Sequence, residues 1–132
     1  MVFDVLVAKR RTPHDLDRPH RTHQLQQLIN NHREQEPRKG TSAERDFPPV
    51  VKLFVPWGAA TWLISECDPG GIAFGLCDMG FGSPELGSLD LQELADIKGP
   101  GGLRIEQDLH WSSDKPLSLW AVEARQRGRI VA

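Results

Sequence analysis

This 132-residue chain has only two cysteines, no tyrosine and no long apolar run. Its two cysteines, Cys67 and Cys77, are too few for the disulfide framework of a small secreted protein, so we expect buried free thiols. No apolar run approaches the roughly 20 residues that a membrane-spanning helix needs. The apolar residues at 1–6 come before the basic residues at 9–11, which reverses the order of a signal peptide. These absences predict a cytoplasmic protein that crosses no membrane.

Charge is divided unevenly along the chain. Residues 1–49 carry nine basic and seven acidic side chains, a net charge of +2, whereas residues 50–132 carry seven basic and eleven acidic side chains, a net charge of −4. The basic excess is too small for the strongly positive surface that nucleic-acid binding needs. We therefore expect no direct nucleic-acid binding. The acidic part instead suits a basic protein partner, such as an enzyme that handles nucleic acid.

The pattern of polar and apolar residues predicts an N-terminal extension over residues 1–49 and an α+β domain over residues 50–132. The extension is expected to be partly disordered, because residues 34–46 are almost entirely polar and charged. It also contains a short apolar stretch at residues 2–8 that suits a strand. One helix is expected from Thr22, with four residues at helical spacing on one face: Leu25, Leu28, Ile29 and His32.

Two apolar stretches of the domain predict a β-hairpin. Strands over residues 60–67 and 71–79 flank the sequence DPG, which suits a three-residue turn with Gly70 at positive φ. Another strand, over residues 50–55, comes before them. This turn sets a register in which five apolar residues share one buried face of the sheet, where Trp120 would pack against them. The five residues are Trp62, Ile64, Ile72, Phe74 and Leu76.

The remaining elements complete an α+β fold. A strand is expected over residues 86–89, and alternating apolar residues predict another over residues 103–109. Asp90 suits the N-cap of a helix over residues 91–98, and Asp114 suits the cap of a helix over residues 115–127. We therefore expect a small antiparallel sheet with two helices packed on one face, preceded by the N-terminal extension.

Four pieces of the chain are distinctive, and together they span about residues 52–121: KLFVPWGAATWLISECDP, IAFGLCDMGFGSPELGSLDLQEL, KGPGGLRIEQDLHW and KPLSLWA. They resemble domain-of-unknown-function family 2958, a family of small bacterial proteins. The resemblance implies cargo of plasmids, integrative elements or phage-like islands. It implies no established reaction, so it indicates a genomic setting rather than a chemistry.

Two carboxylates, Asp78 and Glu85, have no evident local role in the sequence. They flank a glycine-rich loop, and no lysine or arginine occurs between Asp68 and Lys98 to neutralise them. Unpaired carboxylates are tolerated in water, beside a metal ion or against a basic partner. Two tryptophans also lie in or beside turns, where an exposed indole can anchor a partner. We therefore predict a binding surface that includes Asp78, Glu85, Trp57 and Trp111.

No catalytic motif of known mechanism is complete in the sequence, and no cofactor is expected. The run GFGSPELG lacks the lysine and the spacing of a phosphate-binding loop. The histidines are irregularly spaced and lack partner cysteines, which disfavours a zinc site. Clustered carboxylates can hold Mg²⁺ or Mn²⁺, so a metal-dependent hydrolase or nuclease is the enzymatic alternative. Its ligands would come from seven acidic residues: Glu66, Asp68, Asp78, Glu85, Asp90, Glu106 and Asp108.

Together these observations favour a non-enzymatic accessory protein of a mobile genetic element. It would act by binding a macromolecular partner through its acidic, glycine-rich loop. One alternative is an anti-defence inhibitor whose acidic face partly imitates the phosphate backbone of DNA, and the metal-dependent hydrolase is the other.

Overall fold

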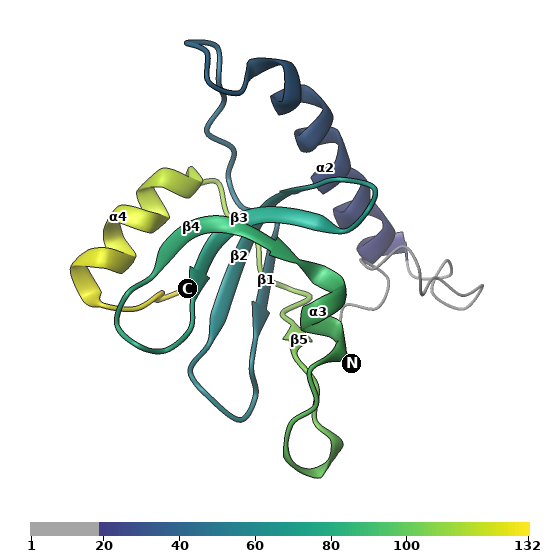
Figure 1. The fold of residues 1–132 in the computed structure, drawn as a ribbon, viewed down its shortest axis with the longest axis vertical. Helices are drawn as coiled ribbons and strands as arrows, with labels where there is room; N and C mark the ends of the chain where they lie inside the picture. Colours follow the sequence, from purple (N-terminus) through teal and green to yellow (C-terminus); the bar gives the residue numbers. More distant parts are fainter. Residues whose placement is uncertain (1–18) are drawn as a thin grey trace.

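The computed structural model of the chain describes residues 19–132. In this part of the chain, five antiparallel strands form one sheet in the order β4-β3-β2-β1-β5 (Figure 1). The α+β class expected from the sequence is confirmed, and the strand predicted over residues 2–8 lies outside the described residues. The strands are β1 (Val51–Phe54), β2 (Thr61–Cys67), β3 (Ile72–Asp78), β4 (Glu85–Asp90) and β5 (Glu106–Gln107). The helices are α2 (Pro19–Gln35), α3 (Leu91–Asp96) and α4 (Leu117–Arg127), with short 3₁₀ turns at η3 (Glu36–Arg38) and η4 (Pro100–Gly102).

Each face of the sheet carries its own hydrophobic cluster, and helices cover both faces (Figure 1). Helices α2 and α3 pack in one cluster with Trp62 of β2. Helix α4 covers the other face, where it packs with Leu63 and Leu76. The two helices predicted over residues 91–98 and 115–127 therefore lie on opposite faces of the sheet. Successive side chains of a strand point to opposite faces, so β2 supplies both clusters.

Helix α2 is joined to the sheet by apolar burial and by one polar contact. Leu25 and Leu28, from the face predicted to be apolar, are both buried. The buried side chain of Asn31 donates a hydrogen bond from Nδ2 to the carbonyl oxygen of Ser65 in β2, at 2.9 Å. The hydrophobic core thus extends to the N-terminal side of residue 50. The division of the chain into an extension and a domain at that residue stays a prediction.

The register predicted for the β2–β3 hairpin is wrong. Trp62 pairs with Cys77 rather than with Leu76. As a result, Trp62 and Ile64 belong to the α2 face of the sheet, whereas Phe74 and Leu76 belong to the α4 face. Four residues of the expected apolar set are therefore divided between two clusters, each with its own helices, and the fifth, Ile72, is 46% exposed rather than buried.

Two local features of the hairpin cause this difference. The turn begins one residue later than expected, so that Gly71 rather than Gly70 takes a positive φ, of 94°. The pairing with β3 then steps from Ile64 to Glu66, which leaves Ser65 as a bulge in β2. One extra residue on a strand moves every residue beyond it to the other face, and this reverses the orientation of the first half of β2.

The other predicted elements are present with shifted ends. The strand over residues 86–89 is confirmed as β4, and the strand over residues 103–109 is reduced to the two residues of β5. The helix over residues 91–98 is confirmed as α3, and Asp90 caps it by accepting a hydrogen bond from the Gln92 N–H at 2.8 Å. No helix among residues 19–132 combines the length and the apolar character needed to span a membrane.

Helix α4 is capped from a distant part of the chain rather than by Asp114. The Oδ1 atom of Asp46 accepts a hydrogen bond from the backbone N–H of Ser118 at 3.1 Å, in the first turn of the helix. On the sheet side, Trp120 packs in the same cluster as Phe74, as expected. Asp46 thereby links the segment before β1 to the α4 face.

Gly75 of β3 provides a test of the close approach between β3 and β2. A Cβ atom at this position would lie 2.1 Å from the carbonyl oxygen of Leu63 and 2.9 Å from the Cα of Ile64. Because both are backbone atoms of β2, we expect Gly75→Ala to lower the free energy of unfolding by about 3 kcal/mol, as overpacking does. Its partner on β4, Gly87, is the matched control, since a Cβ there meets no atom within 4 Å. Urea unfolding should show a loss for Gly75→Ala alone, and equal losses for both variants would contradict the close approach.

Candidate functional site

The four residues predicted to bind a partner lie in separate parts of the molecule. Asp78 ends β3 and Glu85 begins β4, on either side of the loop that joins these strands. Trp57 lies between β1 and β2, half-buried against the α2-face cluster. Trp111 follows β5 and is also half-buried, with its ring 5.8 Å from the ring of Trp120. Two candidate surfaces result, the β3–β4 loop and a groove beside Trp111.

Asp78 is a buried carboxylate with a structural role. Asp78 is 2% exposed. Its Oδ1 accepts a hydrogen bond from the backbone N–H of Gly80, and its Oδ2 accepts one from the backbone N–H of Ile130, both at 2.9 Å. The first bond fixes the start of the β3–β4 loop, and the second holds the C-terminal segment beside the end of β3. The sequence-based premise that Asp78 is an unpaired carboxylate is therefore wrong, because its partners are backbone groups that a count of lysine and arginine does not reveal.

The tip of the β3–β4 loop presents apolar side chains to solvent. Phe81 is 88% exposed, and Met79 is 55% exposed. Gly80 and Gly82 flank Phe81, and both take positive φ angles, of 86° and 85°, as expected for glycines in a tight loop. The backbone thus holds a phenylalanine ring away from the core. Sequence reasoning missed Phe81, although an aromatic residue between two glycines was the available signal.

Glu85 is exposed at the far end of this loop, near the C-terminal part of α4. It lines a surface hollow of about 470 Å³ together with Ser83, Pro84 and Arg125. Arg125 thus brings a basic side chain to the loop from 40 residues further along the chain. With Asp78 buried and Arg125 nearby, the loop is less acidic in three dimensions than its sequence indicates.

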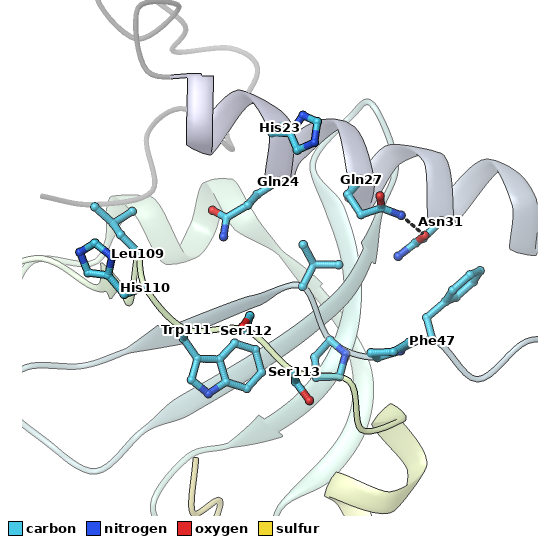
Figure 2. Close-up of a pocket in the computed structure, with 13 residues that line it drawn as sticks. His23, Gln24, Gln27, Asn31, Phe47, Leu109, His110, Trp111, Ser112 and Ser113 are labelled. Atoms are coloured by element: carbon cyan, nitrogen blue, oxygen red, sulfur yellow. Dashed lines mark hydrogen bonds between the residues drawn. The ribbon is translucent and has the colours of Figure 1, made fainter.

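A groove of about 570 Å³ lies between α2 and the segment that follows β5 (Figure 2). Side chains of α2 form one wall, and Trp111 and its neighbours form the opposite wall (Figure 2). The segment before β1 contributes Phe47 and two prolines. Polar groups at the walls include those of His23, Gln24, Gln27, His110 and Ser113.

The walls of this groove are held in place by their own contacts. Gln27 donates a hydrogen bond from Nε2 to Oδ1 of Asn31 at 2.7 Å (Figure 2). On the other wall, the indole of Trp120 donates a hydrogen bond from Nε1 to Oγ of Ser113 at 2.9 Å and packs against Trp111. The volume of the groove is within the range of ligand pockets, roughly 300–1,000 Å³. An apolar base with amide and imidazole groups at its rim suits binding.

The acidic residues considered as metal ligands do not gather at one place. Asp90 caps α3, Asp68 accepts a hydrogen bond from Ile72 in the hairpin turn, and Asp78 accepts its bonds at the end of β3. In the part of the chain that the structure describes, no three or more His, Cys, Asp or Glu side chains are grouped so that they could hold a metal ion. The geometry therefore does not provide the carboxylate cluster on which the hydrolase alternative depends.

Both cysteines are free, and both belong to the α2-face cluster. Cys67 is buried, and burial raises the pKa of its thiol to about 12, with Asp68 and Asp90 contributing in the same direction. Burial also raises the pKa of the half-buried Cys77. Because the thiolate is the reactive form, both side chains behave as apolar groups of the core.

Comparison with known families identifies the chain. Residues 21–131 match the family described as Protein of unknown function (DUF2958). The chain belongs to this family. No curated protein and no solved structure matches it.

The DUF2958 match extends beyond the pieces that carry the resemblance in the sequence. It begins within α2 and ends in the C-terminal segment that Asp78 holds in place. The matched region therefore includes both candidate surfaces, the β3–β4 loop and the groove beside Trp111. Membership of the DUF2958 family assigns no reaction to either.

The burial of Asp78 leads to a stability prediction. Asp78→Ala would leave the N–H groups of Gly80 and Ile130 without their acceptors, so we expect it to lower the free energy of unfolding by about 3 kcal/mol. Glu85→Ala removes an exposed carboxylate of the same loop and should change this free energy by less than about 0.5 kcal/mol. Urea unfolding followed by tryptophan fluorescence measures both. Equal stability of the two variants would show that the Asp78 bonds contribute little.

Proposed function

We propose that this protein is a non-enzymatic binding protein that holds a macromolecular partner at its β3–β4 loop. The observation that carries the proposal is the 88% exposure of Phe81 at the loop tip. A phenylalanine ring in water loses the roughly 1.5–3 kcal/mol that burial of such a side chain provides. Burial of the ring against a partner recovers this free energy, and large aromatic side chains are frequent anchors of protein interfaces.

The loop presents its anchor in a form that suits recognition. Met79 is 55% exposed and adds a flexible apolar side chain near the aromatic ring. Glu85 and Arg125 line a polar hollow that begins at Gly82, directly after Phe81. An apolar centre with charged groups beside it matches the general anatomy of a protein-binding patch. The proposed contact therefore depends first on Phe81 and only second on the acidic side chain.

Charge complementarity favours a basic partner, as expected from the sequence. Residues 50–132 carry a net charge of −4, and this field increases the rate at which a basic partner approaches. We further propose the setting implied by the family resemblance, an accessory protein of a plasmid or other mobile element that acts in the cytoplasm. Imitation of DNA is a weaker form of the proposal, because the loop combines Glu85 with Arg125 and an exposed ring.

Site-specific photo-crosslinking in the bacterial host tests the proposed contact. The crosslinking amino acid p-benzoylphenylalanine replaces Phe81 in one variant and Trp111 in a second. A third variant carries it at Leu103, which is 46% exposed and lies after η4, as a control for random collisions. We expect a discrete protein adduct from position 81 that is absent from position 103.

The three crosslinking positions separate a contact at the loop from one at the groove and from random collision. An adduct from position 111 alone would move the binding site to the groove of Figure 2. A nucleic-acid adduct from position 81 would overturn the expectation of a protein partner. Equal labelling at positions 81 and 103, or none at either, would contradict a specific contact at the loop.

A further inference from the structure

A second pocket, of about 660 Å³, lies on the α4 face of the sheet. It is bounded by the loop that follows η3, by strands β2 to β4 and by the first turn of α4. Its apolar lining includes Phe47, Phe74 and Leu117. Carboxylates come from Glu66 of β2 and, on the loop that follows η3, from Glu44 and Asp46, of which Asp46 accepts hydrogen bonds from Ser118. This pocket is distinct from the groove beside Trp111, with which it shares only Phe47.

Glu66 is buried without a hydrogen-bond donor of its own. The residue is 4% exposed. Its ion-pair partner is Lys39, whose Nζ lies 3.8 Å from Oε1, beyond hydrogen-bonding distance. Among the described side chains, those of residues 23–132, none donates a hydrogen bond to this carboxylate. Burial of the residue disfavours the charged form of this carboxylate, while its oxygens are not fully enclosed and remain open to the pocket.

The basic residues around the pocket already have other partners. Lys39 is half-exposed and also lies 3.5 Å from a carboxylate oxygen of Glu36. Arg45 pairs with Glu34, and its guanidinium lies over the ring of Phe47, 5.1 Å from the centroid. Neither cation provides a close hydrogen bond to Glu66. The position beside its carboxylate therefore suits the positive group of a ligand.

The cross-strand neighbour of Glu66 indicates which kind of cation would fit in this position. Phe74 is the cross-strand partner of Glu66, so the two side chains stand next to each other on the same face of the sheet. A planar cation can bond the carboxylate through two parallel N–H groups and at the same time lie against an aromatic ring. An ammonium group makes point contacts and lacks this planar fit.

We propose that this pocket binds an alkylguanidinium group, with the cation on Glu66 and the ring of Phe74 beside it. Leu117 and Phe47 would enclose the apolar stem. Burial raises the pKa of Glu66, which Lys39 and His32 oppose and Glu36 and Glu44 reinforce. A bound guanidinium favours the ionised carboxylate and compensates for this burial. The group can belong to an arginine side chain of a protein or to a free small molecule.

NMR titration of the full chain with butylguanidinium tests the proposal through the backbone amide signals of Glu66, Phe74 and Leu117. We expect these signals to shift with saturation, and butylammonium, which has the same stem, to bind more weakly. Glu66→Gln keeps the shape of the side chain and should weaken binding by about tenfold or more. Lys39→Gln removes the competing cation and should tighten binding.

Matched variants distinguish binding in this pocket from binding elsewhere on the protein. Phe81→Ser alters the proposed partner contact and should leave butylguanidinium binding unchanged, so failure of either proposal is recognisable separately. Equal affinity of the wild type and Glu66→Gln, or weaker binding by Lys39→Gln, would overturn the inference. An absence of any saturable shift with wild type would overturn it as well.

A short peptide separates the two sources of the group. The probe is acetyl-Gly-Ser-Arg-Ser-Gly-amide, and its counterpart with citrulline in place of arginine is the neutral control. Binding of the arginine peptide alone supports a protein side chain as the ligand. Binding of butylguanidinium without binding of the peptide supports a free small molecule.

Discussion

The bulge at Ser65 is the constraint on which the rest of the structure depends. Because Ser65 has no partner on β3, the two halves of β2 face in opposite senses, and this decides which side chains of β2 enter the cluster on each side of the sheet. Two polar groups of the bulged residue are hydrogen-bonded. Its carbonyl oxygen accepts the hydrogen bond from Asn31 of α2, and its hydroxyl donates one to the carbonyl of Phe74 at 3.3 Å. The same residue therefore orients β2 and attaches α2.

This bulge also decides what the sequence could predict. The turn and cap residues predicted β2, β3 and α3 with ends correct to within two residues, because Gly, Pro and capping Asp act locally. The faces of the strands were not predictable in the same way. A register without the bulge places Trp62 and Phe74 on the same face of the sheet. The local preferences of the residues give no reason to place them on different faces. The separation depends on α2 and α4 packing on opposite sides, which is a long-range property.

The candidate site shows the same division between local and long-range information. Asp78 and Glu85 are similar in sequence, since both border a glycine loop without nearby basic residues. They differ in three dimensions because Ile130, 52 residues away, donates a hydrogen bond to Asp78, whereas Glu85 remains at the surface beside Arg125. The glycines predicted the tight loop itself, and the contact proposed for this loop depends on the phenylalanine between them. Sequence reasoning therefore located the segment but did not single out Phe81.

Phe81 and Glu66 depart from what folding alone favours, and they do so in opposite ways. The ring of Phe81, which is 88% exposed, lacks the apolar burial that stabilises a fold. The carboxylate of Glu66, in a residue that is only 4% exposed, accepts no hydrogen bond and has lost part of its hydration. A serine at position 81 would remove the exposed ring, and a glutamine at position 66 would remove the buried charge. Positions where a sequence departs from local consistency are expected at functional sites. The two departures therefore favour two separate contacts, an apolar one at the loop and a charged one in the pocket of the α4 face.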